Sequence, residues 1–189
     1  MNIKNTLTEK NLIKAVTGET LANNRYSFFA KIARKEGLIQ IANIFEETAG
    51  NEREHAKRFY SYLDRNPIEI TNTYTAGIGD TKENLKLASE LEDDEMRFIY
   101  PSFGDTARDE GFIEIAELFY RIATVEKHHH MRYKNLLENL VEKKLFEKER
   151  ETLWKCLKCG YVVKGTEAPD ECSLCHHPKG YFEILCDNF

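Results

Sequence analysis

The sequence predicts a mainly α-helical protein, in which a bundle of four helices is followed by a small cysteine-rich domain. Apolar residues recur at helical spacing as far as about residue 145. All five cysteines lie at or beyond position 156, and the helical part contains an internal repeat. With 189 residues, of which 41% are hydrophobic and 31% charged, the chain suffices for one ordinary domain and a small one.

The first two predicted helices are separated by a short turn. The first covers about Thr8 to Glu36 and ends at Gly37, and the second covers about Leu38 to Arg65. Asn66-Pro67 ends the second helix, because proline has no backbone N–H with which to continue it. The two helices are therefore expected to form an antiparallel hairpin.

A longer connection leads to the third predicted helix. Residues 67–79 lack helical periodicity and are long enough to run from one end of a bundle to the other. Asp80-x-x-Glu83 reads as a capping box that opens the helix. The helix is predicted to end near Gly111, with a kink at Pro101.

The fourth predicted helix covers about Phe112 to Leu145. Helices of about 28 residues are roughly 40 Å long, and two short turns with one long middle connection are typical of a ferritin-like bundle. The expected organisation is this bundle at residues 1–146, a linker at 147–153 and the cysteine-rich domain at 154–189.

The helical part is a duplication. A shift of 74 residues gives 14 identities in the 34 pairs that begin at positions 25 to 58. The matched pairs include Tyr26 and Tyr100, Glu52 and Glu126, and His55 and His129. Packing explains the shared apolar residues, whereas the shared ionisable residues require another explanation.

Glu52-x-x-His55 and Glu126-x-x-His129 each place a carboxylate and an imidazole on one helix face. A single such motif in an acidic helical protein is usually solvated, but two motifs at the repeat offset are not expected by chance. This duplication points to a functional pair.

Further glutamates are expected to face these motifs. In an antiparallel hairpin that turns near Gly37, Glu19 lies opposite a position near 53. The same construction about Gly111 places Glu95 opposite a position near 127, and Glu92 lies one turn earlier. Buried carboxylates without partners are strongly destabilising, so the pattern predicts a dinuclear carboxylate site for iron or manganese.

Two tyrosines related by the repeat, Tyr26 and Tyr100, lie within two helical turns of these glutamates. They are either core aromatics or donors whose hydroxyls hydrogen-bond metal-ligating carboxylates. His128 and His130 point about 100° away from His129 on the helix and are expected to lie off the site.

Four of the cysteines form the pattern Cys156-x-x-Cys159 and Cys172-x-x-Cys175, which is typical of a tetrahedral thiolate metal site. Zinc is one reading, and the Gly160 turn beside the second thiolate favours iron. Cys186 lies outside this pattern and is expected not to be a ligand. The expected aromatic core of this domain consists of Trp154, Tyr161 and Phe182.

Composition excludes other classes of function. The net charge is −5, and no stripe of lysine and arginine suggests a nucleic-acid partner. No apolar run approaches the length of about 20 residues that spans a bilayer, so no membrane partner is expected. The first residues lack a signal-peptide core, and a cytoplasmic location is expected.

The chain resembles the rubrerythrin family over essentially its whole length. The strings GETLANNRYSFFAKIARKEG, ARDEGF, EKHHHMRY and CGYVVKGTEAPDECSLC carry the resemblance. Ser173 departs from it, because the family usually has proline after the third cysteine.

The resemblance implies site residues. The di-iron ligands would be Glu19, Glu52, Glu92, Glu95, Glu126 and His129, and His55 would replace Glu95 when the irons are reduced. A third iron would be held by Cys156, Cys159, Cys172 and Cys175. Glu95, His55, Tyr26 and Tyr100 would take part in catalysis.

The function implied is a peroxidase that reduces hydrogen peroxide to water, with electrons passing through the four-thiolate iron. A homodimer is implied, with an electron donor such as rubredoxin or an NAD(P)H-dependent reductase. Two alternatives stay open: a ferroxidase or iron-storage bundle, for which the redox domain has no use, and a zinc-stabilised structural module.

Overall fold

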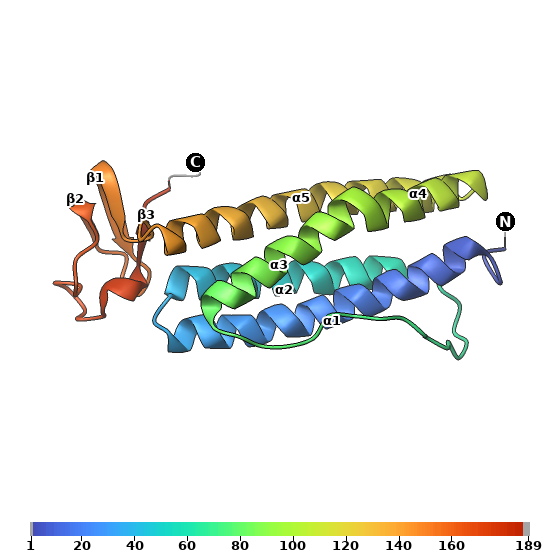
Figure 1. Ribbon diagram of the computed structural model, residues 1–189, viewed down its shortest axis with the longest axis horizontal. Helices are drawn as coiled ribbons and strands as arrows, with labels where there is room; N and C mark the ends of the chain where they lie inside the picture. Colours follow the sequence, from blue (N-terminus) through green and yellow to red (C-terminus); the bar gives the residue numbers. More distant parts are fainter. Residues whose placement is uncertain (1, 187–189) are drawn as a thin grey trace.

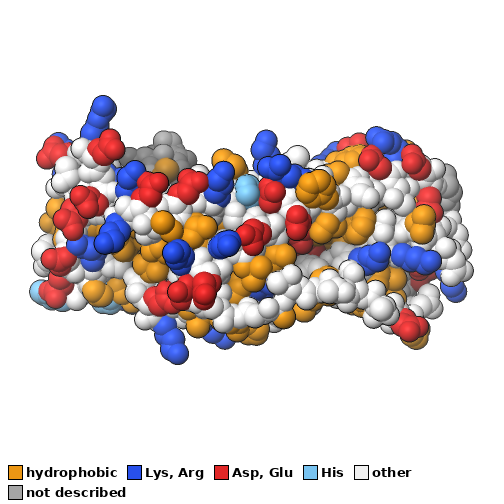
Figure 2. Space-filling view, viewed as in Figure 1, with side chains coloured by type: hydrophobic (Ala, Val, Ile, Leu, Met, Phe, Trp, Pro, Cys, Tyr) orange, Lys and Arg blue, Asp and Glu red, His pale blue; other side chains and the backbone are white. Residues whose placement is uncertain are grey.

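The computed structural model describes residues 2–186 and shows an elongated helical bundle with a small β-sheet domain at one end (Figure 1). Within these residues, no helix combines the length and apolar character needed to cross a bilayer. On the face drawn in Figure 2, acidic and basic side chains are interspersed along the molecule.

Helices α1 (Leu7–Lys35) and α2 (Ile39–Tyr60) form the first antiparallel hairpin. The α1 helix ends as predicted, before Gly37, whose φ of 77° is easily adopted by glycine. The α2 helix ends five residues before the predicted end at Arg65. At its end the Ser61 hydroxyl donates to the carbonyl oxygen of Arg58 over 2.7 Å, a local bond that competes with helix continuation.

Residues 61–80 form the long connection, which runs along the bundle beside α1 (Figure 1). We call residues 64–78 the strap. The capping box that opens α3 (Thr81–Asp94) is confirmed: the Asp80 carboxylate accepts from the Glu83 amide over 2.8 Å, and the Glu83 carboxylate accepts from the Asp80 amide over 3.1 Å.

The third long helix is interrupted, but not by a simple proline kink. A π-helical turn, η1 (Glu95–Ile99), separates α3 from α4 (Tyr100–Asp109). The Tyr100 amide donates to the carbonyl oxygen of Glu95, five residues back. Pro101 follows this turn and has no N–H to offer the preceding carbonyls, so the widened turn and the proline form one irregularity.

Helix α5 (Ile113–Val141) completes the second hairpin by packing along α3, η1 and α4. The bundle core consists of two aromatic clusters related by the duplication. One contains Tyr26, Phe29, Phe45 and Tyr133, and the other contains their counterparts Tyr100, Phe103, Phe119 and Phe59. On each helix, the buried ionisable residues lie between the segments that build the two clusters.

The small domain is a three-stranded antiparallel sheet in the order β2-β1-β3, formed by β1 (Glu147–Cys156), β2 (Val162–Glu167) and β3 (Phe182–Ile184). Residues 147–153, predicted to be a linker, belong to β1. They pair with β2 through a register shift between Glu147 and Thr152, an irregularity that hides the strand pattern in the sequence.

The aromatic core of this domain contains Trp154 and Phe182, as predicted, but Tyr161 is 36% exposed. Tyr161 follows the turn at Gly160 and contributes its carbonyl, which accepts from the Cys156 amide over 2.8 Å. Tyr181 packs against the core in its place.

The two parts of the chain are in contact at the α1–α2 turn. The short 3-10 helix η2 (Lys179–Tyr181) lies against it so closely that a Cβ at Gly180 would overlap the carbonyl oxygen of Gly37. Only glycine allows this backbone approach.

Candidate metal centres

A layer of buried ionisable side chains crosses the bundle between the two aromatic clusters. It contains two groups that could each hold a metal ion, with all donor atoms of a group within 4.8 Å of one another. One group is Glu19, Glu52, His55 and Glu126, and the other is Glu52, Glu92, Glu126 and His129. Glu52 and Glu126 belong to both groups, so they lie between the two positions.

The two groups have nearly the same geometry. Nδ1 of His55 lies 2.8 Å from Glu52, 3.1 Å from Glu126 and 3.7 Å from Glu19. Nδ1 of His129 lies 2.7 Å from Glu126, 3.2 Å from Glu52 and 3.5 Å from Glu92. The duplicated helices therefore build a centre with approximate twofold symmetry.

The tyrosines fulfil both roles that the sequence allowed. Tyr26 and Tyr100 are each 1% exposed and pack in the aromatic clusters. Their hydroxyls also donate to carboxylates across the bundle, Tyr26 to Glu92 and Tyr100 to Glu19. Burial and the neighbouring carboxylates raise the pKa of both phenols well above the ordinary value, so they remain protonated.

The carboxylates perturb one another strongly. Burial raises the pKa of Glu19 to about 8, and burial with neighbouring charges raises the pKa of Glu92 and Glu95 well above the ordinary value. Burial opposes the charge of His129, but the nearby carboxylates, Glu126 first among them, outweigh it and raise the pKa of the imidazole to about 12. Without a cation, the protein must therefore retain protons here to balance the buried carboxylates.

The donor set fits two metal ions. Within residues 2–186, eight buried donor atoms of this layer lack a hydrogen-bond partner: Oε2 of Glu19 and Glu92, both carboxylate oxygens of Glu52 and Glu126, and Nδ1 of His55 and His129. Buried polar atoms without a partner are rare in proteins unless they bind a ligand or an ion. Carboxylate oxygen and imidazole nitrogen are ligands that suit iron and manganese, and four carboxylates balance the charge of two divalent ions.

Glu95 lies outside both groups, so Glu92, rather than Glu95, faces the second Glu-x-x-His motif. The π-turn explains the difference. Tyr26 follows Glu19 by seven residues, whereas Tyr100 follows Glu92 by eight, so the duplication offset is 73 before η1 and 74 after it. At offset 73 the counterpart of Glu95 is Ala22. The sequence signal for this insertion was the repeat of Thr8, Leu12, Ala15 and Glu19 at the shorter offset.

One further residue was not predicted from the sequence. Oδ1 of Asn51 lies 3.3 Å from Nε2 of His129 and can accept a hydrogen bond from an N–H at that nitrogen. A proton on Nε2 leaves Nδ1 of His129 available to a metal ion. His128 is exposed, and His130 contacts the carbonyl of Ser89 over 2.8 Å. The structure thus leaves both of these histidines outside the two groups.

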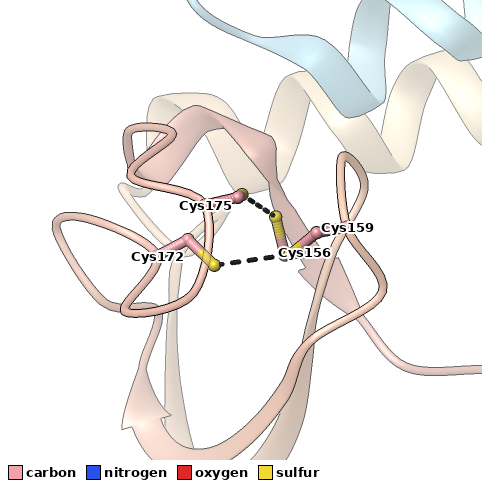
Figure 3. A group of neighbouring side chains, drawn as sticks. All are labelled: Cys156, Cys159, Cys172 and Cys175. Carbon is pink, nitrogen blue, oxygen red and sulfur yellow. Dashed lines mark hydrogen bonds between the residues drawn. The ribbon is translucent and has the colours of Figure 1, made fainter.

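The four cysteines of the small domain form a second centre (Figure 3). The Sγ atoms of Cys156 and Cys175 are 3.7 Å apart, and those of Cys159 and Cys172 are 3.6 Å apart. A disulfide would require about 2 Å, whereas a tetrahedron with metal–sulfur bonds of about 2.3 Å has edges of about 3.8 Å. The cluster therefore fits one tetrahedrally coordinated metal ion.

Backbone amides surround these sulfur atoms. Burial opposes ionisation of Cys172, but hydrogen bonds from the amides of Cys175 and Leu174 outweigh it and lower the pKa of this thiol to about 7. Amide hydrogen bonds to sulfur stabilise the thiolate and tune the potential of a bound iron. Cys186 is exposed and lies outside the cluster.

The fold and the two centres define a class, a ferritin-like dinuclear carboxylate bundle joined to a four-thiolate metal domain. The family model described as rubrerythrin matches residues 10–137, and the model described as rubrerythrin, rubredoxin-like domain matches residues 154–183. The chain therefore belongs to the rubrerythrin family. Its cofactors are a pair of non-haem irons in the bundle and one iron at the four cysteines.

Individual relatives span the whole chain. Identity is 50% with Rubrerythrin-1 of Clostridium acetobutylicum, covering 100% of this chain and 99% of that protein. Identity is 47% with Rubrerythrin of Porphyromonas gingivalis, covering 100% and 94%. Among solved structures, nigerythrin in a mixed-valence state superposes with a TM-score of 0.63 at 31% identity, covering 94% of this chain and 86% of that chain.

Proposed function

We propose that this di-iron oxidoreductase of the oxidative-stress class is a peroxidase that reduces hydrogen peroxide to water. The observation that carries the proposal is the presence, in one chain, of a buried dinuclear site and a four-thiolate site. Four thiolates leave an iron no open position for substrate, so such a site is suited to carrying electrons. An electron carrier in the same chain as a dinuclear centre favours repeated reduction over iron storage.

The reaction consumes hydrogen peroxide, two electrons and two protons and releases two waters. When bound, the irons supply one electron each and a Lewis-acidic site for the oxygen atoms. Glu19, Glu52, Glu92 and Glu126, with His55 and His129, would hold them. These four carboxylates match the charge of a diferrous pair, and Glu95 would add a fifth negative charge once the pair is oxidised.

The tyrosines orient the ligands and keep protons near them. Tyr26 and Tyr100 hold Glu92 and Glu19 through hydrogen bonds, and each phenol stays protonated. A protonated group within hydrogen-bonding reach of a reacting oxygen can act as general acid. We assign the role of general acid to the two tyrosines. Glu95 and His55 would be alternative ligands of one iron, His55 in the reduced state and Glu95 in the oxidised state.

Electrons would reach the bundle from an external donor, such as rubredoxin or an NAD(P)H-dependent reductase, through the four-thiolate iron. This iron lies beyond the Gly37 end of its own bundle, and Glu52 is 13 residues along α2 from Ile39, about 20 Å at 1.5 Å per residue. We propose that the protein is a homodimer in which this electron path is shorter. We also propose a cytoplasmic location, because thiols stay reduced there.

The test is anaerobic stopped-flow absorbance on the fully reduced, iron-loaded protein, mixed separately with hydrogen peroxide and with dioxygen. We expect peroxide to oxidise the di-iron site faster than dioxygen does, and the red colour of the ferric four-thiolate site to follow. If dioxygen is the faster oxidant, the peroxidase proposal is wrong and ferroxidase chemistry replaces it.

A further inference from the structure

A cavity of about 410 Å³ lies on the side of the bundle where the strap passes α1. Its walls come from α1, α3, η1, α4 and the strap, and its lining includes Glu95 and Tyr100. Both belong to the catalytic machinery proposed above. Glu95 is half-buried, whereas the four glutamates of the two metal-binding groups are at most 1% exposed.

We propose that this cavity is the entry route for hydrogen peroxide and that Tyr74 of the strap sets its width. The inference rests on the proposed function, because it concerns how the substrate of that reaction reaches the di-iron site. It assigns a role in access and selection to Tyr74 and Gly18, neither of which supplies a donor atom to a metal-binding group.

Tyr74 is the point at which the strap is anchored. It is half-buried, whereas every other residue from 64 to 78 is exposed. Its hydroxyl donates to the carbonyl oxygen of Lys14 over 3.2 Å, and Nη2 of Arg25 donates to the carbonyl oxygen of Thr75 over 2.9 Å. Two bonds to α1 therefore hold Tyr74 over the cavity.

Gly18 keeps the passage beneath Tyr74 open. A Cβ at this position would lie 3.9 Å from Cε1 of Tyr74, in ordinary contact, and no closer neighbour is found among the described residues. Alanine therefore fits, but a longer side chain would extend into the cavity.

The chemistry of the wall suits a small polar substrate. Asn72, Thr73 and Arg25 line the cavity with hydrogen-bonding groups, whereas Ile99 and Phe103 contribute an apolar wall. Hydrogen peroxide both donates and accepts hydrogen bonds and is small enough to pass. We expect Tyr74 to slow the entry of a bulky organic hydroperoxide more than that of hydrogen peroxide.

The experiment compares Gly18→Leu with Gly18→Ala in the iron-loaded protein. Two rates are measured by stopped flow: oxidation of the reduced protein by hydrogen peroxide, and binding of azide to the oxidised di-iron site. For Gly18→Leu we expect both rate constants to fall about tenfold or more, because access is obstructed. The azide dissociation rate should fall equally and leave the affinity unchanged. Gly18→Ala should stay within about twofold of the parent.

A second variant acts in the opposite direction, so impaired folding cannot imitate it. Tyr74→Ala widens the passage, and we expect it to accelerate oxidation by cumene hydroperoxide relative to hydrogen peroxide, with Tyr74→Phe as the matched control. Unchanged azide rates in Gly18→Leu would overturn the proposal and point to entry beside His55, whose side chain is 13% exposed. If the parent fails to prefer peroxide over dioxygen, the proposed function fails, while the azide rates still test the route.

Discussion

The two hairpins of the bundle are built from one repeated design and differ at a few positions. In the first hairpin, α1 runs unbroken past Ala22. In the second, the π-turn inserts one residue, and Glu95 occupies the place of Ala22. The repeated residues form the symmetric part of the centre, and Glu95 adds a fifth carboxylate where the cavity reaches it. Duplication therefore builds the two metal-binding groups, and we propose that the departure from it contributes to reactivity.

A second difference concerns the histidines. His129 is 1% exposed and lies beside Asn51, whereas the side chain of His55 is 13% exposed. By the repeat, the counterpart of Asn51 is Val125, which has no hydrogen-bonding side chain. One imidazole thus has an amide oxygen beside it, while its counterpart has an apolar residue at the equivalent position.

The largest expected effect comes from removing what the two halves share. Glu52→Gln and Glu126→Gln each replace a carboxylate common to both groups, so both irons of the bundle should be lost in either variant. Glu95→Gln should retain both irons. Iron analysis, corrected for the four-thiolate iron by its visible absorbance, measures this. Unequal losses in Glu52→Gln and Glu126→Gln would contradict the symmetric assignment.

The next effect comes from making the halves alike. Deletion of Glu95 should close the π-turn into continuous α-helix and restore the seven-residue spacing found in the first hairpin. We expect a folded protein that binds two irons but reacts with peroxide about 100-fold more slowly. Glu95→Ala, which keeps the turn, is the control for loss of the carboxylate alone. A deletion variant that reacts at the parental rate would show that the asymmetry has no catalytic role.

The histidine difference can be reversed in a similar way. Asn51→Leu should weaken iron binding in the bundle by about tenfold, because the orientation of His129 is no longer fixed. Val125→Asn should strengthen iron binding on the His55 side, because it places an amide beside His55. Chelator competition on the reduced protein measures the affinities. Equal affinities for Asn51→Leu and the parent would remove Asn51 from the site.

The smallest effect concerns the helix starts. The Glu110 carboxylate accepts from the amides of Leu7 and Thr8 over 3.0 and 2.8 Å, and Glu36 accepts from the Thr81 amide over 3.2 Å. Glu110→Gln should lower the free energy of unfolding by about 1 kcal/mol, and Glu36→Gln by less because its bonds are longer. Thermal unfolding of the iron-loaded protein measures both.

The Glu110 contribution should depend on pH. Hydrogen bonds from Thr8 and Leu7 hold the pKa of Glu110 below its ordinary value in the folded protein. The stabilisation is therefore present above the ordinary pKa and is lost as the pH falls through the lower, folded value. The difference between parent and Glu110→Gln should vanish at low pH, and a difference that persists there would be inconsistent with this assignment.

Much of the architecture and most of the site follow from short-range patterns. The Glu-x-x-His motifs lie on one face because helix geometry alone places residues three apart together. The four cysteines cluster as their spacing predicts, and the capping box at Asp80 forms as expected. The helix faces, the capping box and each Cys-x-x-Cys pair depend on neighbours within a few residues, so local geometry is sufficient for them, whereas the meeting of the two cysteine pairs depends on the fold of the small domain.

Tertiary packing decided the rest. Which of Glu92 and Glu95 faces α5 depends on a π-turn whose register is set by packing against another helix. The choice of Tyr181 over Tyr161 in the small core, and the strand at residues 147–153, depend on pairing with residues distant in the chain. The cavity under Tyr74 exists because the strap packs against α1, a segment about 60 residues away in sequence. Periodicity determines which face of a helix is buried, but contacts between distant segments select the partner it meets.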